Sequence, residues 1–229
     1  MQTTSNNEQE SALLDFLLEY ITPERKAKFE KVLDQRTRHI TLILEDIFQA
    51  QNASAVLRSC DLTGIQDVHI VENQYTYDIN PDVVVGSTKW LDLHKYNQNS
   101  FNTIDAFDKL REKGYRIIAT SPHESGYTPE DIPLDKPIAL VFGTEKTGLS
   151  PEALSNADGY VRIPMVGFTE SYNISVSAAL LLYSITNRLR QSQLDWQLKP
   201  LERQKLMLQW CKNTIKRVEM LEQEFFKRR

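Results

Sequence analysis

The sequence predicts an α/β fold, with a mostly parallel β-sheet flanked by helices and with additional helices at both ends of the chain. From His39 onward, short apolar runs alternate with helical stretches, the pattern typical of βα units. Before His39 and after Pro200, helical patterns replace this alternation. A length of 229 residues suits one domain of catalytic size with helical additions. We therefore expect helical extensions at 1–38 and 191–229 and a central domain at 39–190.

The N-terminal segment predicts two helices. Residues 1–10 are polar and are expected to form a disordered tip, and 11–21 a short helix. The second helix should start after Thr22, because threonine is a good N-cap and Pro23 suits the first helical position. It should run to about Asp34.

The central segment predicts alternating strands and helices. Strands are expected at 40–45, 67–71, 90–95, 116–120, 137–142 and 160–163. Helices are expected at 53–63, 102–113 and 173–190, the first two ended by Gly64 and Gly114. After Pro200 one long amphipathic helix is expected, with an apolar stripe of Leu201, Leu208, Ile215, Leu221 and Phe225.

Several classes of protein are excluded or disfavoured. Cys60 and Cys211 form neither a disulfide framework nor a zinc-ligand spacing, so a reducing cytosol is the expected location. The glycines match neither the dinucleotide-binding motif nor the P-loop motif. No apolar stretch is long enough to span a bilayer, so no membrane contact is expected. The four histidines are scattered along the sequence, and no metal site is expected. They are interpreted as structural, except that His123 follows a predicted strand and is therefore a candidate for the site.

Basic charge is concentrated at the two ends of the chain. The net charge is -4, yet residues 22–38 carry +3 and residues 200–229 carry +4, which leaves -11 for the remainder. This asymmetry fits an anionic partner held by the ends. Two amphipathic helices with ordinary solvated faces explain it equally well.

Three loops that follow strands carry the unusual polar residues, and such loops are where ligands bind in parallel sheets. The first contains Asn52 and Arg58. Asn52 alone reads as the N-cap of helix 53–63, with Arg58 on its surface. Because six residues turn a helix by about 600°, the two side chains would reach a substrate from different sides or across a subunit interface.

The second loop, Val141–Leu149, holds Glu145 between Gly143 and Gly148, and glycine lets backbone N–H groups approach a ligand closely. A plain strand-to-helix turn is the alternative.

The third loop places Ser171 and Asn173 directly before a helix rich in alanine and serine. Alone, Asn173 reads as an N-cap and Ser171 as a turn residue.

In order and spacing, the three loops resemble a known family. N-x-x-x-x-x-R, F-G-x-E-x-x-G-L and I-P-M-x-G-x-x-x-S-x-N-x-S-x-A-A are similar to the motifs of the SpoU branch of the SPOUT RNA methyltransferases, over roughly residues 39–190. The segments ITLILEDIFQAQNASAVLRSCDLTGI and GSTKW resemble the TrmH-type tRNA (guanosine-18) 2'-O-methyltransferases in particular.

The resemblance implies a C-terminal trefoil knot, a homodimer and S-adenosylmethionine as cofactor. General chain rules treat knots as nearly absent, so residue patterns alone would predict an open sheet. The implied cofactor contacts are Thr120, Gly143, Ile163, Met165 and Tyr172. Tyr172 departs from the family, which more often has leucine there.

The implied reaction methylates a ribose 2'-hydroxyl of tRNA and needs no metal. The resemblance assigns Arg58 to this hydroxyl and uses Asn52, Glu145, Ser171 and Asn173 to shape the site. The family account often makes the arginine a general base. Because guanidinium stays protonated in proteins, we expect Arg58 instead to bind a phosphate and stabilise the developing alkoxide.

The basic ends are expected to contact tRNA phosphates. The residues are Arg25, Lys26, Lys28, Arg36, Arg38, Lys212, Lys216 and Arg217. Two alternatives remain at this point: a ribosomal RNA ribose methyltransferase, and a noncatalytic RNA-binding factor with the same fold.

Overall fold

A computed structural model describes residues 2–47, 49–75, 86–99 and 101–228. The chain forms two compact units. One combines the terminal segments Met1–Arg36 and Gln197–Arg229, and the other comprises Thr37–Trp196.

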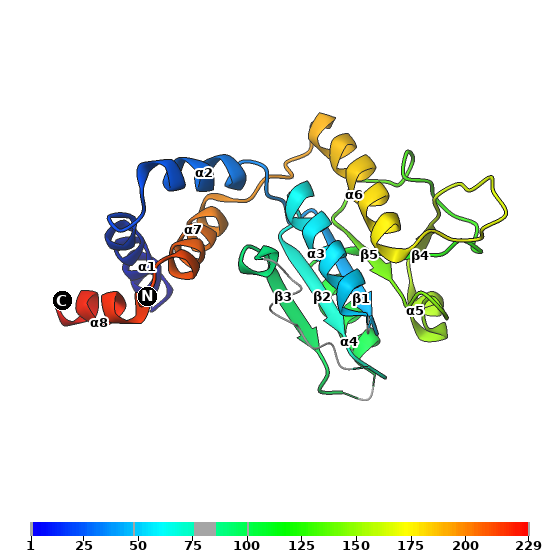
Figure 1. Ribbon diagram of the computed structural model, residues 1–229, viewed down its shortest axis with the longest axis horizontal. Helices are drawn as coiled ribbons and strands as arrows, with labels where there is room; N and C mark the ends of the chain where they lie inside the picture. Colours follow the sequence, from blue (N-terminus) through cyan, green and yellow to red (C-terminus); the bar gives the residue numbers. More distant parts are fainter. Residues whose placement is uncertain (1, 48, 76–85, 100, 229) are drawn as a thin grey trace. The chain divides into compact units, whose positions relative to one another are not determined.

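The larger unit is built on a six-stranded sheet with the strand order β3-β2-β1-β5-β4-β6, in which every neighbouring pair is parallel (Figure 1). The strands are β1 (Ile40–Glu45), β2 (Asp67–Val71), β3 (Asp92–Tyr96), β4 (Arg116–Thr120), β5 (Ile138–Phe142) and β6 (Gly159–Val161). The mostly parallel sheet predicted from the sequence is therefore confirmed. The bounds of β1, β2 and β4 are as predicted, and those of β3, β5 and β6 are shifted by one or two residues.

Helices cover both faces of the sheet. On one face, α3 (Ala50–Thr63) and α6 (Ile174–Gln191) pack side by side over the even-numbered residues of β1, β2 and β5 (Figure 1). On the other, α4 (Asn102–Glu112) and α5 (Pro151–Asn156) cover odd-numbered residues of β1, β4 and β5. A short 3-10 turn, η1 (Ser87–Lys89), precedes β3. Burial on both faces explains why the central strands read as continuous apolar runs.

The insertion of β5 between β1 and β4 determines where a site can form. Leu44 is level with Phe142, and Ala119 is level with Val141, so the carboxyl ends of three strands meet at one edge. Strand order reverses at this point, and loops there leave a crevice for a ligand.

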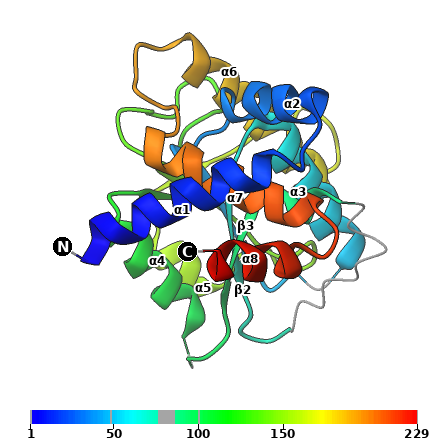
Figure 2. The same cartoon turned by 90° about the vertical axis from the view of Figure 1, so that its left-hand side faces the viewer.

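The terminal unit contains four helices in the part of the chain that the structure describes. They are α1 (Gln2–Leu18), α2 (Pro23–Leu33), α7 (Pro200–Thr214) and α8 (Val218–Lys227). Helix α1 packs against α7 (Figure 2), and Trp210 is buried with its ring 5.6 Å from that of Phe29. In the described ranges, no helix is both long and apolar enough to cross a membrane.

Three predictions of helix boundaries are wrong. Helix α1 begins at Gln2, not after a disordered tip at 1–10. Helix α3 begins after Gln49, so Asn52 lies in its first turn and does not cap it. The single helix expected after Pro200 is two helices, because Arg217 adopts a left-handed φ of 56°. The expected start of α2 is confirmed, since the Thr22 side chain accepts a hydrogen bond from the Arg25 N–H.

A partly buried polar cluster lies beneath α4, between β2 and β3. Asp67 accepts a hydrogen bond from Arg38 and contacts His94 Nε2 at 2.7 Å. The His94 ring stacks on His69 at 4.7 Å, and His69 Nδ1 lies 3.0 Å from the Tyr96 hydroxyl. Burial, and then the nearby His94, lower the pKa of His69 to about 3. Burial alone would raise the pKa of Asp67, but hydrogen bonds from His94 and Arg38 lower it.

Candidate functional site

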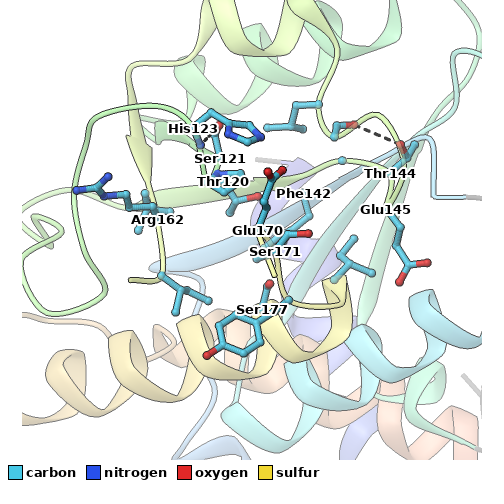
Figure 3. Close-up of a pocket in the computed structure, with 18 of the residues that line it drawn as sticks. Thr120, Ser121, His123, Phe142, Thr144, Glu145, Arg162, Glu170, Ser171 and Ser177 are labelled. Carbon is cyan, nitrogen blue, oxygen red and sulfur yellow. Dashed lines mark hydrogen bonds between the residues drawn. The ribbon is translucent and has the colours of Figure 1, made fainter. Parts of the chain in front are cut away.

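The loops that follow β4, β5 and β6 enclose a cavity of about 340 Å³ (Figure 3). Its wall includes every residue predicted to contact the cofactor: Thr120, Gly143, Ile163, Met165 and Tyr172. Glu145 and Ser171 line it as well. The volume lies within the range of about 300–1,000 Å³ that is usual for small-molecule sites.

Glycine at position 143 is required by the shape of the loop between β5 and α5. A Cβ atom there would lie 2.2 Å from the carbonyl oxygen of Gly148, which real side chains essentially never do. Thr144 N donates to Gly148 O at 2.9 Å, and Gly148 N donates back to Thr144 O at 3.1 Å. The loop is therefore closed on itself, with its backbone against the cavity.

The wall beside β4 is held by hydrogen bonds to its neighbours. Thr120 Oγ1 donates to Val141 O at 2.8 Å, and Ser121 N donates to Val161 O at 3.1 Å. The same loop contributes His123, so the histidine singled out for its place after a strand does line the cavity.

Sequence reasoning missed several other wall residues. They are Ser121, Pro122, Phe142, Arg162, Glu170, Ser177 and Leu181. Figure 3 shows Ser121, Glu170 and Ser177 around the same hollow as Thr120. Most of them stand at the end of a predicted strand or in the first turns of α6, and these positions were the signal in the sequence that could have identified them.

Asn173 joins residues from all three loops. Its Nδ2 donates to the Glu145 carboxylate and to Asn52 Oδ1, the latter at 3.2 Å. Its Oδ1 accepts from Ser175 N at 2.8 Å, which confirms Asn173 as the N-cap of α6. Asn52 in turn donates to Gln49 at 2.6 Å. Three residues predicted from separate segments therefore form one cluster.

This cluster lies at a second, smaller hollow that adjoins the main cavity. Its wall contains Asn52 and Glu145, together with Gly143, which lines the main cavity too. A ligand that fills the main cavity would therefore end close to amide and carboxylate groups that can hold a second, polar ligand.

Arg58 lies apart from this cluster in the described part of the chain. It is exposed on α3, six residues beyond Asn52, which corresponds to a rise of about 9 Å along the helix. It is not part of the wall of either hollow. Its exposed neighbours on α3 are Gln51, Ala55 and Leu62, spaced as one stripe.

The residues expected to bind RNA differ in their surroundings. Arg25, Lys26 and Lys28 on α2 are exposed, as are Lys216 and Arg217 between α7 and α8. Five of the eight residues expected to bind RNA are therefore exposed on the terminal unit.

The other three expected RNA-binding residues engage the protein itself. Arg36 is 1% exposed, with its guanidinium 5.5 Å from the centre of the Trp210 ring. Arg38 pairs with Asp67 and, at 2.6 Å, with Asp92. Lys212 pairs with Glu222 at 2.6 Å. Burial makes Arg36 unsuited to the phosphate contact expected of it, and pairing with two carboxylates does the same for Arg38.

Within the described ranges, no group of three or more His, Cys, Asp or Glu side chains is placed to hold a metal ion. Besides amides, hydroxyls and backbone groups, the walls of the two hollows carry the carboxylates of Glu145 and Glu170 and the basic side chains of His123, Lys146 and Arg162. These groups can bind and orient a ligand and balance its charge.

Comparison with known proteins agrees with this arrangement. Residues 39–183 match the model of the SpoU rRNA Methylase family. The chain belongs to the SpoU methylase family. The resemblance seen in the three sequence motifs is thereby confirmed.

A relative from Borreliella burgdorferi, named tRNA (guanosine(18)-2'-O)-methyltransferase, is 45% identical over 90% of this chain and 93% of its own. The crystal structure of the A. aeolicus TrmH/SpoU tRNA modifying enzyme is similar, with a TM-score of 0.73 and 26% identity over 84% of this chain and 98% of that one. The SpoU methyltransferase AviRb from Streptomyces viridochromogenes, in complex with AdoMet, shares the fold, with a TM-score of 0.59 and 22% identity over 69% of this chain and 60% of that one.

Proposed function

We propose that this protein transfers a methyl group from S-adenosylmethionine to a ribose 2'-hydroxyl of tRNA, at guanosine 18. The observation that carries the proposal is the joining of Asn52, Glu145 and Asn173, beside a cavity lined by the five expected cofactor residues. The name of the 45% identical relative supports the choice of substrate and position.

The cavity suits the proposed cofactor. Ile163 and Met165 offer apolar surface for an aromatic base, and the closed loop at Gly143 brings backbone groups to the wall. Thr120 and Tyr172 complete the set that would hold it. S-adenosylmethionine, when bound, supplies an electrophilic methyl group.

The contribution of the protein is placement and charge stabilisation. Holding two reacting groups in line accounts for about 7–11 kcal/mol of barrier reduction in well-oriented systems. A guanidinium group carries a permanent positive charge in proteins, so Arg58 would bind a phosphate and stabilise negative charge as it develops on the 2'-oxygen. Ser171 and Asn173 would orient the ribose from the opposite side of the site.

The separation of Arg58 from the cluster leads to a second part of the proposal, that the protein acts as a homodimer. On α6 the exposed residues Val176, Leu180 and Tyr183 form an apolar stripe, and α6 packs beside α3, which carries Arg58. Exposed apolar surface of this kind is typical of a subunit interface. Pairing two copies there would let Arg58 of one copy serve the cavity of the other.

Mixed dimers test this arrangement. Arg58→Ala and Asn173→Ala chains are each expected to lose most of the activity, whereas a mixture that exchanges subunits should recover part of it through one intact composite site. No recovery in a mixture shown by mass to contain mixed dimers would contradict the shared site.

We also propose that the chain forms the expected trefoil knot. Tyr127, in the loop from β4 to β5, is hydrogen-bonded to the edge of β6 opposite β4, through Tyr160 O at 2.8 Å and Arg162 N at 3.0 Å. Arg188 of α6 donates to Pro129 O and Ile132 O of this loop, both at 2.9 Å. In the proposed knot, the chain that follows β6 passes through the loop between β4 and β5. The contacts of this loop with both β6 and α6 support that arrangement. A crystal structure that traces residues 116–190 tests it.

The terminal helices are proposed to form the tRNA-binding extensions at 1–38 and 191–229, around the methyltransferase domain at 39–190. Supporting this, Lys216 and Arg217 line a groove of about 580 Å³ within the terminal unit, together with the half-exposed Tyr20. Cations beside an aromatic ring suit an RNA backbone and a base. tRNA affinity should fall steeply with salt, and neutralising Lys216 should make that dependence shallower. The cytosol, where tRNA is found, is the proposed location.

The experiment that tests the function uses bulk unmodified tRNA and cofactor labelled in its methyl group. We expect label in tRNA, mapped to the ribose of guanosine 18, and little in ribosomal RNA. Label mainly in ribosomal RNA would make that the substrate. Tight RNA binding without cofactor binding by calorimetry would indicate a noncatalytic factor.

A further inference from the structure

A buried carboxylate lies beneath the cofactor loop. It belongs to the TrmH-like segment 40–65 but lies outside the three loop motifs and outside the proposed site. Glu45 is the last residue of β1 and is 2% exposed. Its Oε1 accepts hydrogen bonds from Thr103 Oγ1 at 2.5 Å and from Ser150 Oγ at 2.8 Å. Its Oε2 accepts from Ser150 N at 2.8 Å.

Ser150 stands where the cofactor loop ends. The loop leaves β5 at Gly143, returns at Leu149, and is followed by Ser150, which caps α5 through its hydroxyl and the N–H of Ala153 at 3.0 Å. Both ends of the loop are therefore anchored to the sheet: one through β5 and the other through Glu45.

The geometry of the sheet brings Glu45 to this position. β1 and β5 are parallel neighbours, and Leu44 is level with Phe142, so Glu45 is level with the first residue of the loop. A strand end next to a loop in register can hold that loop without taking part in the cavity wall, and Glu45 does not line the cavity.

The contacts of Glu45 suit a carboxylate, which only accepts hydrogen bonds, and do not suit an amide, which also donates them. Thr103 Oγ1 itself accepts a hydrogen bond from Asn73 Nδ2 at 2.9 Å, which directs its own hydrogen toward Glu45. Ser150 offers Glu45 two donors, one backbone and one side chain. A glutamine would place an NH₂ group against one of these donors, because the amide has only one acceptor oxygen.

We propose that Glu45 is a positioning residue for cofactor binding: through Ser150 it holds residues 143–149 in the closed shape that forms one wall of the cavity. This inference rests on the proposed function for the identity of the cofactor. It assigns Glu45 no contact with the reacting groups.

The test compares Glu45→Gln with Thr103→Val. Both remove a hydrogen bond from the same buried carboxylate site, but Thr103 belongs to α4, and its hydroxyl bonds to Glu45 and Asn73 and not to Ser150. We expect Glu45→Gln to weaken S-adenosylmethionine binding at least tenfold by calorimetry, with KM for tRNA unchanged. Thr103→Val should lower the melting temperature while cofactor affinity stays within threefold of the wild type.

A second readout needs no cofactor. Lys146 is exposed within the loop and is a trypsin site. Release of the loop in Glu45→Gln should speed cleavage after Lys146 at least fivefold in the native protein, and Thr103→Val should leave that rate unchanged. If Glu45→Gln does not fold, Ser150→Ala, which loses the hydroxyl donor, should give the same two effects in weaker form.

Equal affinity and equal cleavage rate in Glu45→Gln and the wild type would overturn the inference. So would equal losses in Glu45→Gln and Thr103→Val, because Glu45 would then only stabilise the fold. If the wild type itself binds no cofactor, the proposed function fails, and the cleavage rates still decide whether Glu45 holds the loop.

Discussion

Replacing Asn173 by serine separates its two roles. Serine caps helices about as well as asparagine, so the start of α6 should be kept, whereas the Nδ2 donor to Glu145 and Asn52 is lost. A hydrogen bond to a neutral group contributes about 0.5–1.5 kcal/mol, and one to a charged group about 1.5–3 kcal/mol. Because Glu145 and Asn173 are exposed and Asn52 is half-buried, solvent screens these bonds, and a total near the lower end, about 2 kcal/mol, is expected.

If the transition state loses all of this hydrogen-bond free energy, kcat/KM should decrease roughly 30-fold. Methyl transfer from labelled cofactor to tRNA measures it, with urea unfolding alongside. Asn173→Ser should lose no more than about 2 kcal/mol of stability, while Asn173→Ala should also lose the cap and with it roughly a further 0.5–2 kcal/mol. Wild-type kcat/KM in Asn173→Ser would refute the role of the three-residue cluster.

Three further predictions follow from the same structure. Gly143→Ala should weaken cofactor binding more than tenfold by calorimetry, since its Cβ would meet the Gly148 carbonyl, while Gly167→Ala, with nothing within 4 Å, should bind normally. Because the pKa of His69 is about 3 in the folded protein, only the unfolded chain takes up its proton between pH 6.5 and 3. The contribution of neutral His69 to the free energy of unfolding is therefore complete above pH 6.5 and is lost as the pH falls. Lowering the pH to 5 should decrease the free energy of unfolding of the wild type by roughly 2 kcal/mol more than that of His69→Gln, as measured by urea unfolding. Arg58→Lys should lower kcat without moving its pH profile; near-full activity with an acid-shifted profile would make residue 58 a titrating base.

Local signals predicted the elements well where capping and burial act within a few residues. Thr22 and Asn173 cap the helices expected of them, and both bonds join residues two or three positions apart. Continuous apolar runs predicted the strands because the sheet is covered on both faces.

The wrong or missing predictions concern positions whose structure or contacts depend on residues far away in the sequence. Asn52 reads as a cap, yet its side chain accepts from Asn173, 121 residues away in sequence. Glu45 ends the strand predicted at 40–45, but no neighbouring residue indicates that its carboxylate binds Ser150, 105 residues on. No glycine or proline marks the break at Arg217. Nor could spacing show that β5 lies between β1 and β4, which brings the three loops together.

The most direct measurement uses a tRNA transcript in which guanosine 18 alone carries hydrogen in place of its 2'-hydroxyl. If the site methylates that ribose oxygen, this transcript should bind with nearly unchanged affinity and take up no label, while the unmodified transcript takes up one methyl group per molecule. Undiminished labelling of the 2'-deoxy transcript would contradict the account, because the methyl group would then be going to another atom.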